Sequence, residues 1–202
     1  MKTNTLLGSV GATVSIVTSA TAAMVVSFDS AAFNSTTIFE TIGFEFEVNS
    51  PIRIDGLGSY DDSKDGLSAA VEVGLWTAAG SPLAQVTVPA GAGAPLDNWF
   101  RWQTLPSTLT LNPGRYVVGA MTQNPGEPFG WQPSSFTTVP EVAFVEDRYS
   151  WGSPLQYPSS TTGFNGWYGG NVHVAVPEAA GTAVLAGLGL LGFAASRRFG
   201  VY

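Results

Sequence analysis

The chain has 202 residues, a formal net charge of −7 and no cysteine. The lack of cysteine excludes thiol catalysis, cysteine-bound zinc and iron–sulfur clusters. Residues 24–175 contain 14 acidic and 5 basic residues. A surface this acidic repels nucleic acid and anionic lipid, which excludes both as binding partners of this region.

Residues 1–23 have the composition of a secretory signal peptide. Lys2 supplies an early positive charge, Leu6–Val17 is uncharged, and Ala20-Thr21-Ala22 forms an A-x-A cleavage pattern. The glycine, serine and threonine residues inside the uncharged run would make a poor structural helix. We therefore predict an N-terminal signal helix over residues 1–23, and export of the remaining chain.

Residues 24–175 are predicted to form one all-β domain that needs no disulfide, because they have the length of a single domain and short apolar runs separated by glycine and proline. Gly43–Val48 alternates apolar and acidic residues, which predicts a half-buried strand. The chain beyond Thr122 is expected to be irregular, with short pieces around Phe144 and Trp151. The other predicted strands are Ile52–Ile54, Val71–Trp76, Leu83–Val88, Phe100–Leu105, Leu109–Leu111, Tyr116–Met121 (expected to be central) and Asn171–Val176. About nine short strands predict an antiparallel β-sandwich, jelly-roll or immunoglobulin-like.

An acidic loop at residues 61–66 has the spacing of a calcium-binding loop. If Asp61 is counted as the first position, oxygen-bearing side chains occupy positions 1, 3, 5 and 12, and glycine occupies position 6. The candidate ligands are therefore Asp61, Ser63, Asp65 and Glu72, in a non-helical geometry, because the preceding residues do not favour a helix. The alternative is a solvated acidic turn between two strands.

The chain contains six tryptophans, and flat aromatic rings on a β-sandwich can stack on sugars. The loop around Asn165, Trp167 and Tyr168 is the candidate for carbohydrate binding, because its rings lie next to an amide that can hold hydroxyl groups. The alternative is that these aromatic side chains pack in the core or along strand edges.

The sequence contains no pattern that identifies an enzyme. His173, the only histidine, is expected to be structural or exposed. The chain has no G-x-S-x-G motif for a nucleophilic serine. Carboxylates for glycoside hydrolysis are available, but no pair stands out by its spacing. We therefore predict a non-catalytic protein.

Residues 176–202 have the layout of a C-terminal sorting signal. Val176, Pro177 and Glu178 are followed by 17 uncharged residues, Ala179–Ala195, and by Arg197 and Arg198. A helix over the uncharged run would be about 25 Å long, close to the thickness of a membrane core. The positive-inside rule would then place the arginines in the cytoplasm. A permanent tail anchor and a hydrophobic core helix are the alternatives.

This layout resembles the PEP-CTERM tail of Gram-negative bacteria, the substrate signal of exosortase enzymes. The resemblance implies recognition and cleavage near Val176, Pro177 and Glu178 by an exosortase-type enzyme after passage through the secretion translocon. It also implies a transient stay in the inner membrane, followed by a location in the cell envelope, at the surface or outside the cell. Ala179 stands where a second proline is usual.

Residues 40–125 resemble an uncharacterised β-sandwich domain found in exported PEP-CTERM proteins. The residues that carry this resemblance include Val73-Gly74-Leu75-Trp76 and Leu111-Asn112-Pro113-Gly114-Arg115-Tyr116. Exosortase systems are associated with exopolysaccharide, so the resemblance implies an extracellular-matrix protein with a structural or adhesive role. A carbohydrate-binding module acting on exopolysaccharide is the alternative, and a glycan-active hydrolase is a third reading.

Overall fold

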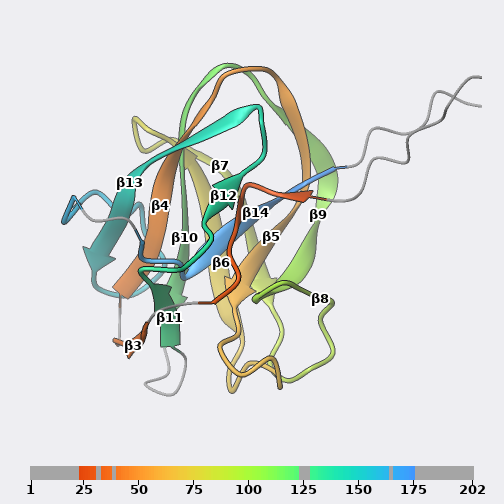
Figure 1. Cartoon of the computed structure of the whole chain (residues 1–202), viewed down its shortest axis with the longest axis vertical. Helices are drawn as coiled ribbons and strands as arrows, with labels where there is room; N and C mark the ends of the chain where they lie inside the picture. The colour runs from red at the N-terminus through yellow and green to blue at the C-terminus, as the bar shows by residue number, and fades with distance from the viewer. Residues whose placement is uncertain (1–22, 31–32, 38–39, 123–127, 164–165, 176–202) are drawn as a thin grey trace, which may run out of the picture. The chain divides into compact units, whose positions relative to one another are not determined.

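The computed structural model describes residues 23–30, 33–37, 40–122, 128–163 and 166–175. These residues form 14 strands and no helix, and all the strand pairs are antiparallel. The structure confirms the prediction of an antiparallel all-β fold (Figure 1). Of the predicted helices at residues 1–23 and 176–202, only Ala23 is among the described residues, and it lies in the two-residue strand Ala23–Met24.

Two five-stranded sheets make up most of the described body. The β5 sheet has the order β1 (Ala23–Met24), β14 (Gly170–Val174), β5 (Ile52–Tyr60), β9 (Phe100–Leu111) and β8 (Leu96–Asp97). The β4 sheet has the order β13 (Val142–Trp151), β4 (Glu40–Val48), β10 (Gly114–Thr122), β6 (Val71–Thr77) and β7 (Pro82–Val88). Two short ribbons pair β11 (Pro128–Trp131) with β3 (Phe33–Thr36), and β12 (Thr137–Thr138) with β2 (Val26–Ser27).

A single apolar core joins the two sheets into a β-sandwich. Phe44 and Val118 of the β4 sheet and Leu57 and Val172 of the β5 sheet belong to this core, and all four are completely buried. Tyr168 belongs to the same core, with its ring centroid 5.5 Å from that of Phe44. Because burial of apolar area is the dominant favourable term in folding, this layer can hold the body together without a disulfide.

Strand β4 is buried on both faces, which corrects the prediction of a half-buried strand. Residues 152–163, after β13, cover the face opposite the sandwich core. In this segment the backbone N–H of Gln156 donates a 3.3 Å hydrogen bond to Thr41 Oγ1, and the Tyr157 ring packs edge-on against Trp76. The sequence alternation of β4 was real, but the acidic face is covered by a distant part of the chain.

This covering buries the carboxylate of Glu45, whose side chain is 2% exposed. Arg148 of β13 contacts Glu45 Oε2 through Nη2 and also donates a 3.0 Å hydrogen bond to it through Nε. Arg115 approaches the other oxygen at 3.5 Å. A buried carboxylate is tolerated only when charge and hydrogen-bond partners replace water, and the two arginines supply these partners.

The segment after residue 122 is more regular than predicted. Val142–Trp151 forms a ten-residue strand, β13, which pairs with the whole length of β4. Its register shifts between Phe144 and Glu146, and this bulge interrupts the alternation that would have revealed the strand. Tyr116–Met121 lies within β10, which is the central strand of its sheet as predicted.

Glu40 provides a pH-dependent prediction. Burial raises the pKa of its carboxyl above the ordinary value, and a hydrogen bond with Thr37 opposes this only in part. The folded state therefore holds the proton more tightly than the unfolded state. The stabilising contribution is complete at low pH and is lost as the pH rises through the folded-state pKa.

We therefore expect Glu40→Gln to raise the melting temperature at neutral pH and to lose this advantage below a pH of about 4, where the wild-type carboxyl is protonated in both states. Calorimetry at several pH values measures the difference. Glu47→Gln, at a half-buried position of the same strand whose side chain is 44% exposed, is the control and should show no gain. An unchanged difference between Glu40→Gln and wild type across the pH range would contradict the prediction.

Candidate functional site

Strand β5 is irregular at Asp55. Strand β5 pairs with β9 on one side and with β14 on the other. In both ladders Ile54 and Gly56 have partners but Asp55, which lies between them, has none. Ile54 and Leu57 are both completely buried, whereas a regular strand would place residues three apart on opposite faces. The extra residue turns both Asp55 and Gly56 toward the face that carries His173. Bulges of this kind re-aim side chains and are common beside binding sites.

Two glycines make room for rings on this face of β5. A Cβ atom on Gly58 would lie 2.6 Å from the Trp102 ring, and one on Gly56 would lie 3.3 Å from the Cβ of His173. Any larger residue at position 58 would displace the indole. Trp102 and His173 consequently lie close to the β5 backbone, with ring centroids 5.2 Å apart in an edge-to-face arrangement.

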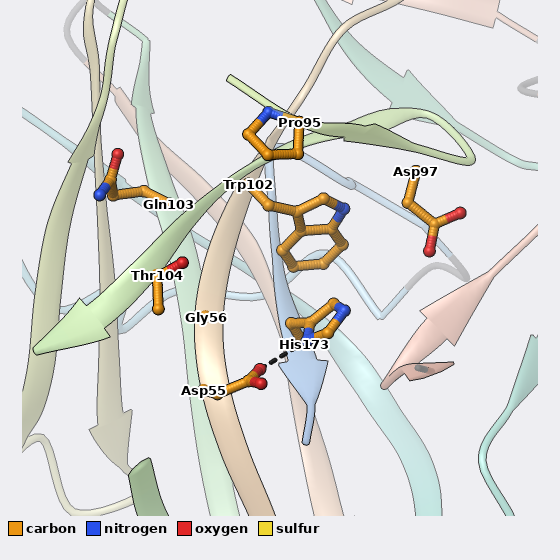
Figure 2. Close-up of a pocket in the computed structure, with 8 residues that line it drawn as sticks. All are labelled: Asp55, Gly56, Pro95, Asp97, Trp102, Gln103, Thr104 and His173. Carbon is orange, nitrogen blue, oxygen red and sulfur yellow. Dashed lines mark hydrogen bonds and ion pairs between the residues drawn. The ribbon is translucent and has the colours of Figure 1, made fainter. Parts of the chain in front are cut away.

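These side chains line a cavity of about 240 Å³ (Figure 2). The lining comes from β5, β9, β14 and the short β8 region: Asp55, Gly56, Pro95, Asp97, Trp102, Gln103, Thr104 and His173. Pockets for drug-sized ligands usually measure roughly 300–1,000 Å³. This cavity is smaller, and its size suits one small ring rather than a large cofactor.

Asp55 fixes the orientation of His173. His173 Nδ1 lies 2.5 Å from Asp55 Oδ1, and the two side chains are 20% and 35% exposed. Figure 2 shows the second ring nitrogen, Nε2, directed away from Asp55, where it can meet a ligand. The expectation of a structural or exposed histidine is therefore incomplete, because His173 is paired with a carboxylate in a cavity.

The lining combines hydrogen-bond acceptors and donors around an aromatic ring. Asp55 and Asp97 contribute carboxylates, and Gln103 contributes an amide. Trp102 is 7% exposed, and its Nε1 is buried without a hydrogen-bond partner among the described residues. A ligand rich in hydroxyl groups matches this set, because each hydroxyl can both donate and accept. The only hydroxyl in the lining, on Thr104, lies across the β5 ribbon from His173 in Figure 2, so the cavity does not align it as a nucleophile.

A second cavity of about 250 Å³ shares Asp97 with the first. It is lined by Ala23, Met24, Ser27, Asp97, Asn98, Thr137, Thr138 and Val139. The Oδ1 atom of Asn98 is buried and has no hydrogen-bond partner within the described part of the chain. Asp97 thus lines both of these small cavities, an arrangement that can hold neighbouring units of a chain-like ligand.

The acidic loop contains an internal ion pair. Asp61 is 2% exposed, and its Oδ2 accepts a 2.6 Å bond from Arg101 Nε and a 3.1 Å bond from the backbone N–H of Gly66. The rest of the Arg101 guanidinium donates to backbone carbonyls, including that of Lys64 at 3.0 Å. This network holds the loop against β9.

The four predicted calcium ligands are not brought together. Ser63 and Asp65 are exposed on the loop, whereas Glu72 lies on β6 and accepts a 3.1 Å hydrogen bond from Gln85. No group of three or more histidine, aspartate or glutamate side chains in the described ranges could hold a metal ion. In this arrangement Asp61 has a cationic partner and Glu72 belongs to a strand, so calcium binding by the loop stays a prediction.

The aromatic residues predicted to bind sugar have different environments. Tyr168 is completely buried in the core, which excludes it as an exposed platform. Trp167 is half-buried, with its ring centroid 4.9 Å from that of Tyr149, and Asn165 lies outside the described residues. The exposed member of this cluster is Trp151, which is 69% exposed and packs edge-on against Tyr149.

The sorting-signal residues Val176, Pro177, Glu178, Arg197 and Arg198 lie outside the described residues. Within the described part of the chain, no helix is long and apolar enough to cross a membrane. No protein-family model, curated protein or solved structure matches the chain.

The ion pair of the acidic loop leads to a stability prediction. Arg101→Met should lower the free energy of unfolding by about 3–5 kcal/mol, because Asp61 would remain buried without its cationic partner. Urea denaturation measures this loss. Adding Asp61→Asn should recover part of it, since the uncompensated charge is removed. A loss below about 1 kcal/mol, the range of surface ion pairs, would show that the pair does not organise the loop.

Proposed function

We propose that this chain is an exported protein of the cell envelope or extracellular matrix, with a non-catalytic structural or adhesive role. The observation that carries the proposal is the C-terminal layout of Val176-Pro177-Glu178, an uncharged run and two arginines. The two five-stranded sheets support a jelly-roll or immunoglobulin-like body.

In this proposal the two ends of the chain serve transport. The signal helix over residues 1–23 directs the chain to the secretion translocon, and the C-terminal helix holds it briefly in the inner membrane. An exosortase-type enzyme then cleaves near Pro177 and Glu178, and the body passes to the surface. The cysteine-free core supports this route, because such a body can fold after export without an oxidising catalyst.

Intact-mass measurement of the protein isolated from its native host tests the processing. We expect a chain that begins near Ala23 or Met24 and lacks Arg197 and Arg198. The control is Glu178→Gln, which alters the proposed recognition element and should leave the C-terminal arginines in place. Recovery of the complete tail from wild-type protein in its final location would show that the tail is only an anchor.

Carbohydrate binding is the second candidate function, and the cavity around Trp102 favours it. The cavity places an aromatic ring, two carboxylates and an imidazole within the space of one small ring, and a second polar cavity continues beyond Asp97. Sugars are recognised by such combinations of an apolar face with hydroxyl-binding groups. An exopolysaccharide would be the ligand in the envelope or matrix.

A glycan array probed with wild-type and variant protein tests this candidate. Asp97→Asn should weaken binding about tenfold or more, because it removes a charged hydrogen-bond acceptor shared by both cavities. The matched control is Asp65→Asn, the same chemical change at an exposed position that lines neither cavity. Loss of binding on Trp151→Ala but not on Asp97→Asn would move the site to the exposed aromatic cluster. Release of sugars during the incubation would instead indicate the hydrolase.

A further inference from the structure

Strand β7 is an exposed sheet edge without charge. It is seven residues long, Pro82–Val88, and pairs with β6 on one side only among the described strands. No charged residue occurs between Val73 and Leu96 in a chain whose net charge is −7. Leu83 on this strand is 38% exposed. An edge of this kind presents a row of backbone N–H and C=O groups that can pair with another strand.

The other edges of the two sheets are short or occupied. β1 and β8, which border the β5 sheet, have two residues each. β13 borders the β4 sheet opposite β7, but Ser160 folds back onto it and exchanges two backbone hydrogen bonds with Tyr149, at 2.8 and 2.9 Å. Short edges and covering loops are the usual protection against strand addition. Strand β9 is also open beyond Arg101, because β8 pairs only with Phe100 and Arg101, but Pro106 interrupts that edge. Within the described part of the chain, β7 is the other long open edge, and its pairing with β6 is regular from Ala84 to Val88.

We propose that β7 pairs antiparallel with β7 of a second copy of this chain, so that the two β4 sheets form one continuous sheet. Elsewhere the acidic surfaces of two copies repel each other, and the uncharged stretch around β7 is where two copies can approach without that repulsion. A twofold axis requires only that the surface complements itself. An antiparallel pairing of two β7 strands satisfies this requirement, because each strand then presents the same edge to the other.

The register follows from the ends of the strand. Pro82 begins β7 and Pro89 follows it, and proline cannot donate a ladder hydrogen bond. The longest overlap is therefore centred on Gln85, which would face Gln85 of the other copy. Val86 and Val88, which are buried against the core, would extend the apolar layer of one sandwich toward the next. Gln85 also bonds Glu72 at 3.1 Å, which holds the nearest carboxylate on β6.

A contact made by one strand edge is small, so it is expected to be weak in dilute solution. Copies concentrated on a surface or in a matrix would associate far more readily, because linkage raises their effective concentration. This inference concerns assembly, and it does not depend on the Trp102 cavity or on any ligand.

Disulfide trapping tests the pairing, because the chain has no cysteine of its own. Full-length Gln85→Cys in detergent solution should form a covalent dimer on mild oxidation, since directly opposed residues in an antiparallel pair have Cα atoms about 4.5–5.5 Å apart, within the range for a disulfide. The matched control is Ser107→Cys, an exposed position on β9 of the other sheet, which should remain monomeric. Equal trapping of the two variants would overturn the proposal.

Sedimentation gives a second, non-covalent readout. Gln85→Lys places like charges opposite each other across the twofold axis and should raise the dimer dissociation constant roughly fivefold or more relative to wild type. Ser107→Lys adds the same charge away from β7 and should leave the constant unchanged. Wild-type protein that stays monomeric at the highest attainable concentration, or dimers that are unaffected by Gln85→Lys, would overturn the proposal.

Discussion

Every other feature of the described body depends on apolar packing between the two sheets, because the chain has no cysteine with which to cross-link them. Completely buried side chains from both sheets meet in one core, which also contains the Tyr168 ring. This packing fixes the face to which each strand residue points. The core holds the residues on either side of an inserted residue in place. An insertion in a strand therefore turns the inserted side chain toward the outer face. The bulge at Asp55 is such an insertion, and it produces the Trp102 cavity.

Burial on both faces of the β4 sheet has an electrostatic consequence. Once residues 152–163 cover the outer face, Glu45 must have cationic partners, and Arg148 and Arg115 provide them. Asp61 is placed in the same way beside Arg101. These five ionic groups are thus committed to holding loops and strands in position. The exposed carboxylates that remain, including Asp97, are the ones available to a ligand or to solvent.

The sequence was sufficient to predict the fold class, most strands of the two sheets and the central position of Tyr116–Met121, because alternation and turn residues are local signals. It was not sufficient for β13, whose bulge breaks the alternation, or for the burial of Glu45, which depends on a distant segment. The calcium interpretation relied on spacing alone, and spacing did not reveal that Arg101 would reach Asp61 from another strand. The Asp55–His173 pair joins residues far apart in the sequence; Gly56-Leu57-Gly58 was its only local signal, since alternate glycines leave space for rings.

The two surfaces proposed to bind, one a ligand and the other a second copy of the chain, lie on different sheets. The Trp102 cavity is built on β5, β9 and β14, whereas the free edge belongs to β7 of the β4 sheet. A ligand in the cavity would therefore not occupy the edge, and pairing at the edge would not require any of the residues that line the cavity. Association of copies would multiply the number of cavities presented to one polymer, and several weak sites acting together bind far more tightly than one. Weak pairing and a small cavity thus fit the same proposed role outside the cell, in which strength comes from the number of contacts.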